Sequence, residues 1–183
     1  MSARRRHLFG ALVAVALAAG CGDDGTDASG AFIAFTDDFR AFRTWTRTAV
    51  GTDALTDHPT GPRFAYANRP PPAAGVEYPV GTILVHTIEP AANPQMWDIF
   101  AMVKRGGGYN ANGATGWEFF RLGVSASGVP VILARGLNPN EGHSYGGGGA
   151  TTQMQGCNAC HGAATAAAHD HVLSPRLWPG ATP

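Results

Sequence analysis

The sequence predicts an α+β fold whose main part is an antiparallel β-sheet, and two observations support this. Several short segments rich in β-branched and aromatic residues are separated by clusters of proline and glycine, which is typical of antiparallel strands. A helical pattern of aromatic residues precedes these segments, and an alanine-rich stretch follows them near the C-terminus. We therefore expect a single domain in which helices flank the sheet.

The first 20 residues have the three zones of an export signal. A basic run at 4–6 precedes an apolar run at 8–19, which is short for a bilayer-spanning helix. Small residues then lead directly to Cys21, an arrangement that resembles the lipobox of bacterial lipoproteins. Residues 1–20 are therefore predicted to be a lipoprotein signal peptide, with Cys21 as the lipidated first residue of the mature chain. A buried or paired thiol at Cys21 is the alternative.

Residues 21–30 are predicted to be a lipidated cysteine followed by a flexible tether, because GDDGTDASG has no large apolar residue to bury. The folded domain is then 31–183, which is long enough for one hydrophobic core. Such a domain lies outside the cytoplasm on a bacterial membrane. Gly22 after the cysteine favours the outer membrane, by resemblance to lipoprotein sorting.

Charge excludes one class of partner. The 13 Lys and Arg residues balance the 13 Asp and Glu residues. The basic residues are also scattered along the chain, so the sequence predicts no nucleic-acid-binding surface.

The helical pattern begins at Thr36, a predicted N-cap that is followed by two acidic residues. Phe39, Phe42 and Trp45 recur at helical spacing, so we expect an amphipathic helix that ends near Thr48. Strands are then expected over Arg63 to Asn68, Gly81 to Glu89, Trp97 to Lys104, Gly116 to Leu122 and Val129 to Ala134. Four consecutive glycines at 146–149 predict a loop, and Gly162 to Ala168 predicts a helix.

The motif CNACH at 157–161 carries the most specific chemical information. At this spacing, the thiolates of Cys157 and Cys160 reach the two vinyl groups of one porphyrin, and the adjacent His161 is brought to the iron. The motif therefore predicts one covalently attached haem c. Two alternatives stay open: a zinc site completed by His169 or His171, and a CxxC disulfide that leaves His161 without a role.

The order of motifs resembles that of the cytochrome P-460 family and its relative cytochrome c′-beta. An early aromatic helix is followed by YPVGTILVH, FAMVKRGGGYN, GWEFF and CNACH, and then by Asp170. The similarity runs from about Phe39 to Asp170, and it is strong only at GTxxV, MVK, the W-E/A-F strand and CxxCH. It implies a haem-bearing antiparallel sheet flanked by helices. It also implies a haem with an open distal face that binds nitric oxide or oxidises hydroxylamine.

Residue by residue, the resemblance assigns the two attachment cysteines and the proximal ligand to CNACH, and a distal arginine to Arg63. His86 stands where the hydroxylamine-oxidising members have a lysine that cross-links to the porphyrin. Phe100 stands where they have a distal glutamate, although Asp98 on the same strand face could replace it. Loss of the glutamate base weakens the assignment as a hydroxylamine oxidase. An apolar ring at this position instead resembles the distal pocket of the gas-binding cytochrome c′-beta branch.

His86 divides the remaining hypotheses. A histidine in a strand is ordinarily a core residue bonded to a backbone carbonyl, but the resemblance directs its strand face toward the haem. If the ring binds iron, the protein is an electron carrier. If it stands beside Arg63, the two residues resemble a peroxidase pair. Enzymatic activity is therefore undecided at this point.

The sequence also yields expectations about partners. We expect a small ligand such as nitric oxide, hydroxylamine or peroxide, an unidentified redox partner protein, and a membrane bound through Cys21. Whether the domain forms a homodimer is undecided. Lys104, at the end of its strand, is expected to face solvent.

Overall fold

The computed structural model describes residues 30–51, 61–139 and 156–181, and the structural statements below concern these ranges. The predicted signal peptide, Cys21 and the glycine run at 146–149 lie outside the described residues. Within the described ranges, no helix has the length and apolar character that crossing a membrane requires.

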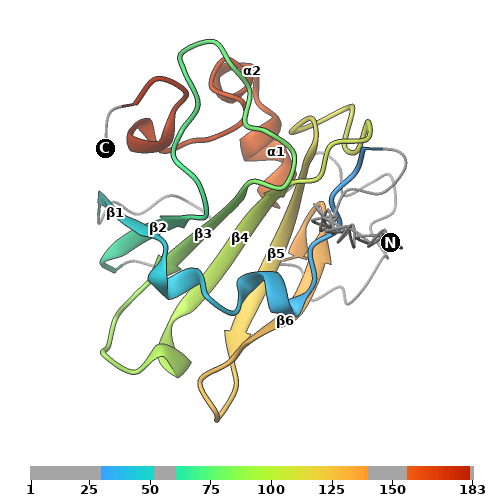
Figure 1. The fold of residues 1–183 in the computed structure, drawn as a ribbon. Coiled ribbons are helices and arrows are strands. Elements are labelled where there is room, and N and C mark those ends of the chain that lie inside the picture. Colours follow the sequence, from blue (N-terminus) through green and yellow to red (C-terminus); the bar gives the residue numbers. More distant parts are fainter. Residues whose placement is uncertain (1–29, 52–60, 140–155, 182–183) are drawn as a thin grey trace, which may run out of the picture.

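Six antiparallel strands form one sheet in which neighbours along the chain are also neighbours in space (Figure 1). The strands are β1 (Thr46–Gly51), β2 (Arg63–Ala67), β3 (Ile83–Ile88), β4 (Asp98–Lys104), β5 (Trp117–Val124) and β6 (Pro130–Gly136). The predicted antiparallel sheet is confirmed. All the predicted strand segments form strands, with small differences at their ends.

The helix expected over Thr36 to Thr48 is wrong in its second half. Two short 3-10 helices, η1 (Thr36–Phe39) and η2 (Phe42–Thr44), form the first part, and β1 then begins at Thr46. The sequence of β1 is TRTAVG, which contains three β-branched residues and pairs with β2 along its length. Pairing with a neighbouring strand therefore outweighs the helical spacing of the aromatic residues, although Phe39 and Phe42 are buried as expected.

One face of the sheet packs against the N-terminal segment (Figure 1). The Phe39 ring lies 5.2 Å from the Phe120 ring, and the Phe42 ring lies 5.2 Å from the Tyr66 ring in an edge-on arrangement. These contacts belong to a larger apolar cluster on the same face, which includes Val85, Ile99, Ala101, Val103 and Leu122. This face is thus closed by the hydrophobic core.

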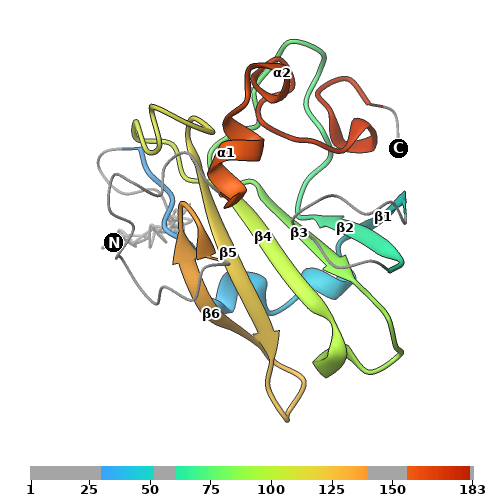
Figure 2. The same ribbon diagram turned by 180° about the vertical axis from the view of Figure 1, so that it is seen from behind.

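The opposite face is covered by the C-terminal segment, and Figure 2 shows α1 in front of this face. This segment contains α1 (Gly156–Gly162), α2 (Ala164–Ala167) and η6 (Pro175–Leu177), and a further short helix, η3 (Pro94–Met96), precedes β4. The alanine-rich helix is confirmed only over α2, because Ala163 has an extended backbone that separates it from α1. The sequence did not predict that CNACH would itself be helical.

Candidate functional site

The CNACH motif lies on α1, and its residues differ in burial. Cys157 is half-buried and Cys160 is exposed, and no disulfide joins them in the described part of the chain. Cys157 and His161 are four residues apart, so they lie on the same face of the helix. This face is turned toward the sheet, because Cys157 packs against the apolar cluster that contains Leu84, Met102 and Phe119.

Asn158, between the two cysteines, fixes α1 to the loop before β5. Its side chain is buried, and its Oδ1 accepts hydrogen bonds from Asn110 Nδ2 (2.7 Å) and from the Ala114 N–H (3.0 Å). Its own backbone N–H donates to Asn138 Oδ1 at 3.1 Å. Sequence reasoning gave this variable position of the motif no role. A polar residue between the two cysteines was the only local signal.

A cavity of about 260 Å³ lies between the sheet and the C-terminal segment. Strands β1 to β5 form one wall, and α1 together with residues from 172–177 forms the other. Most of its lining is apolar. Five of the residues singled out from the sequence line it together: Arg63, His86, Phe100, Cys157 and His161. Cys160 is not part of the lining.

Strand register explains why the sheet residues meet in this cavity. His86 on β3 pairs with Ala65 on β2 and with Phe100 on β4, so these three share one face of the sheet. Arg63 is two residues from Ala65 and therefore lies on the same face. The His86 and Phe100 rings are stacked, with centroids 6.3 Å apart and an interplanar angle of 28°. Arg63 is only 4% exposed, so its cation is held at the buried end of this wall.

Asp98, the carboxylate nearest to Phe100 along β4, does not line the cavity. It shares the strand face of Phe100, as expected, but its Oδ1 accepts a hydrogen bond from Arg121 Nη2. The Arg121 guanidinium in turn lies 4.5 Å from the centre of the Phe100 ring. The cavity wall at this point is therefore a phenyl ring, with the ion pair of Asp98 beside it and outside the lining.

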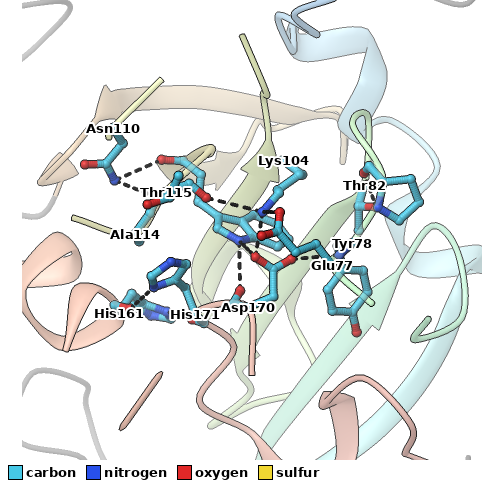
Figure 3. Close-up of polar contacts among 12 residues, drawn as sticks. Glu77, Tyr78, Thr82, Lys104, Asn110, Ala114, Thr115, His161, Asp170 and His171 are labelled. Atoms are coloured by element: carbon cyan, nitrogen blue, oxygen red, sulfur yellow. Dashed lines mark hydrogen bonds and ion pairs between the residues drawn. The ribbon is translucent and has the colours of Figure 1, made fainter. Parts of the chain in front are cut away.

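His161 is held by a reciprocal pair of hydrogen bonds with His171 (Figure 3). Nδ1 of each ring lies 2.7 Å from the backbone carbonyl oxygen of the other residue. A carbonyl oxygen only accepts, so each Nδ1 must carry a hydrogen and donate it. In a neutral His161 ring the lone pair is then on Nε2, which is the usual arrangement of a metal-binding histidine.

Lys104 is buried, so the expectation that it faces solvent is wrong. It follows Phe100 and Met102 at every second position of β4, and it therefore projects under the C-terminal segment like them. Its Nζ lies 2.5 Å from Asp170 Oδ1 and 3.3 Å from Glu77 Oε2, and it donates to the Thr115 carbonyl at 3.3 Å (Figure 3).

Asp170 and His171 are buried in a strained turn that follows α2. Their φ angles are 50° and 64°, in the left-handed region that costs a residue with a side chain about 1–2 kcal/mol. Burial, and secondarily the Asp170 charge, raise the pKa of the Tyr78 phenol. That phenol donates a hydrogen bond to the Leu177 carbonyl at 2.6 Å.

The zinc alternative finds no support in the described residues. The His169 ring stacks on Trp178 with centroids 3.6 Å apart, and Nδ1 of His171 bonds to the His161 carbonyl. Among residues 30–51, 61–139 and 156–181, no group of three or more His, Cys, Asp or Glu side chains is arranged to hold a metal ion.

Fold and site together define a single-sheet protein in which a CxxCH helix faces an apolar cavity containing a buried arginine and a second histidine. No family model, curated protein or solved structure matches the chain.

Proposed function

We propose that the protein is an extracytoplasmic c-type cytochrome that binds or converts a small ligand at a covalently attached haem. The observation that carries the proposal is the shared cavity. His161, with its Nδ1 committed to the His171 carbonyl, and Cys157 line the same space as Arg63 and His86. An apolar lining with a few convergent polar groups is typical of cofactor sites.

The residues of α1 fit haem c in their donor chemistry. The thiols of Cys157 and Cys160 would form thioethers with the two vinyl groups, and His161 Nε2 would coordinate the iron. When bound, haem supplies an iron that changes oxidation state and accepts a diatomic or similarly small ligand. The apolar residues Leu84, Met102 and Phe119 would contact the macrocycle.

On the sheet side, three residues would act on the ligand. Arg63, a buried cation, stabilises negative charge that develops on it. His86 donates or accepts a proton through its imidazole. Phe100 excludes water and charged ligands, which favours a small neutral ligand such as nitric oxide. It also stands where a carboxylate base for hydroxylamine oxidation would be needed, which makes that reaction the weaker candidate.

Covalent attachment tests this proposal directly. We expect the chain, expressed with a haem c maturation system, to gain the mass of one haem and to retain the pigment after acid extraction. A Cys157→Ala, Cys160→Ala double variant should lose both properties, whereas His169→Ala, a control outside the motif, should keep them. A mature wild-type chain without added mass would show that CNACH is structural.

Electron transfer is the second candidate, because both His86 and His161 line the cavity. If His86 is the sixth ligand, the ferrous protein is low-spin and its spectrum does not respond to carbon monoxide. In that case His86→Ala should make the spectrum responsive. A wild-type ferrous spectrum that shifts with nitric oxide and carbon monoxide supports the ligand-binding function instead.

The same proposal includes a lipid anchor at Cys21, argued from the signal sequence. We expect the mature chain to fractionate with membranes when expressed in a Gram-negative host. A Cys21→Ser variant should be recovered in a non-membrane fraction or remain unprocessed. Membrane release of the wild-type chain by salt alone would contradict the anchor.

A further inference from the structure

The ion pair between Lys104 and Asp170 is buried beside the proposed site and has no role in the function described so far. Its two side chains are 6% and 4% exposed, and Lys104 Nζ lies 2.5 Å from Asp170 Oδ1. Burying a pair of charges contributes little to stability, because the loss of hydration offsets their attraction. Stability alone therefore does not account for the buried Lys104–Asp170 pair.

Asp170 anchors the strained turn just before Val172, which lines the cavity, and Figure 3 shows its contact with Lys104. Its Oδ2 accepts from the Tyr78 N–H at 2.7 Å, and Trp117 Nε1 donates to its carbonyl oxygen at 2.9 Å. The His171 N–H then donates to the Ala166 carbonyl at 2.7 Å. The carboxylate of Asp170 is thus held by β4 and by the segment before β3, and the peptide group that follows Asp170 is held by Trp117 on β5 and by the Ala166 carbonyl.

The anchored turn ends at the carbonyl that contacts His161. The left-handed backbone at Asp170 and His171 points the His171 carbonyl oxygen at His161 Nδ1, at 2.7 Å. A hydrogen bond from Nδ1–H to a fixed carbonyl sets the tautomer and the orientation of the ring. It also makes Nε2 a stronger electron donor.

We propose that Asp170, held in place by Lys104, is a positioning residue for His161. The pair fixes the His171 carbonyl, and this carbonyl fixes the imidazole that faces the cavity. The consequence for iron rests on the proposed function, but the hydrogen bond on which it depends is present in the polypeptide alone. The effect of Asp170 on the His161 hydrogen bond and its effect on the iron can therefore be tested separately.

The first test observes the His161 ring in the full chain produced without haem attachment. In ¹⁵N-histidine NMR spectra, we expect wild-type His161 to be the Nδ1–H tautomer with slow exchange of that hydrogen. Asp170→Ala removes the carboxylate and disfavours the left-handed backbone, so the tautomers should mix and exchange should accelerate. Asp170→Asn tolerates the backbone and keeps a neutral acceptor, so it should lie between the two.

Glu118→Gln is the matched control for the loss of a buried charge. Glu118 is 3% exposed and is paired with Arg135 and Arg105, but it lies on the face of β5 opposite Trp117. Its loss should leave the His161 signals unchanged. Equal changes in Glu118→Gln and Asp170→Ala would show that the effect is general loosening and would overturn the proposal.

The second test uses the haem-loaded chain. In Asp170→Ala, the iron–histidine stretching band of the ferrous protein should move to lower frequency, and the midpoint potential should rise, because Nε2 donates less strongly. Asp170→Asn should show smaller shifts and Glu118→Gln none. If wild-type protein carries no haem, the proposed function fails, while the tautomer measurement still decides the present inference.

Asp170→Ala removes the closer and more buried partner of the Lys104 charge and leaves only the exposed Glu77, so this variant carries a risk of failing to fold. The double variant Lys104→Met, Asp170→Asn removes both charges and keeps the backbone tolerance. In this variant the hydrogen on Nδ1 of His161 should exchange faster than in wild type. A folded double variant with wild-type exchange at His161 would overturn the proposal.

Discussion

At the scale of single residues, His86 shows how much a side chain depends on its surroundings. On the strand it would be an ordinary core histidine, but its half-buried ring stacks on Phe100 and faces a cavity that also contains His161. Phe100 and Asp98 share a strand face, yet only the phenyl ring lines the cavity. The functional hypothesis therefore rests on an imidazole and a guanidinium rather than on a carboxylate.

For a ligand-binding site, we expect His86→Ala to change the rate at which the bound ligand dissociates and to leave the coordination of the ferrous iron unchanged. Loss of one hydrogen bond of about 1.4 kcal/mol corresponds to about a tenfold faster dissociation. Nitric oxide dissociation followed by stopped-flow absorbance measures this rate. Met102→Leu, an apolar change in the same cavity, is the control. An equal effect in both variants would remove the specific role of His86.

A second residue-scale prediction concerns Tyr109 at alkaline pH. Burial, and then the charge of Glu118, raise the pKa of Tyr109 to about 12 from its ordinary value near 10. The folded chain keeps a proton that the unfolded chain loses between these values. Its stabilising contribution is therefore complete below about pH 10 and declines as the pH rises toward 12.

We therefore expect the free energy of unfolding of wild type to fall between about pH 9 and about pH 11, as measured by urea denaturation. Tyr109→Phe should show a smaller fall over this interval, because its ring cannot ionise. Identical slopes in the two proteins would mean that Tyr109 has an ordinary pKa in the folded state.

At the scale of elements, the contacts that hold α1 in position decide where the motif residues point. The helix contains only residues 156–162, so its position depends on contacts with its neighbours. A Cβ added at Gly113 would lie 2.4 Å from the Asn158 side-chain atoms, so this glycine makes room for the anchor of the helix. A buried amide and a close backbone approach together fix α1 against the loop before β5.

Gly113→Ala should consequently displace Asn158 and lower the free energy of unfolding by about 1–3 kcal/mol, the cost of an unsatisfied buried polar group. It should also reduce the yield of covalently attached haem, because the two thiols and His161 move with the helix. Gly123→Ala is the control, since its Cβ would meet only the flexible end of Leu133, at 3.1 Å. Chemical denaturation and haem content per chain are the measurements. A normal haem content in a folded Gly113→Ala variant would show that the packing of Asn158 against Gly113 is not needed to position α1 for haem attachment.

At the scale of the whole molecule, the two faces of the sheet differ in how they are packed. One face is closed by aromatic and aliphatic packing with the N-terminal segment, and the other holds the cavity under the C-terminal segment. A cofactor bound in the cavity would contact both the sheet and the C-terminal segment. Because contacts that the attached haem makes only in the folded state stabilise that state, the proposed haem should stabilise mainly the C-terminal segment.

Hydrogen exchange of haem-loaded and haem-lacking chains tests this expectation. Amides of α1 and of residues 170–177 should exchange more slowly when haem is attached, and amides of β6, which contributes no residue to the cavity lining, should change less. Uniform protection over the whole sheet, with no preference for the C-terminal segment, would place the cofactor elsewhere or exclude it.

The sequence by itself determined the features that depend on neighbouring residues along the chain. Segments rich in β-branched and aromatic residues between Pro and Gly clusters predicted β2 to β6, and the spacing of CNACH placed two thiols and an imidazole within one short segment. The meeting of Arg63, His86 and Phe100 was expected only from the family resemblance. These local signals suffice because strand composition and motif spacing need no information about distant partners.

Only the tertiary structure decided the features that depend on distant partners. Lys104 is buried because Asp170, 66 residues later, comes to lie against it, and nothing near Lys104 in the sequence shows this. Thr46 begins a strand because it can pair with β2, although the helical spacing of the preceding aromatic residues predicts that a helix continues there. The carbonyl that orients His161 belongs to a left-handed turn, whose strain is sustained only by contacts from three separate segments. Long-range pairing, which the chain cannot encode locally, therefore sets the geometry of the site.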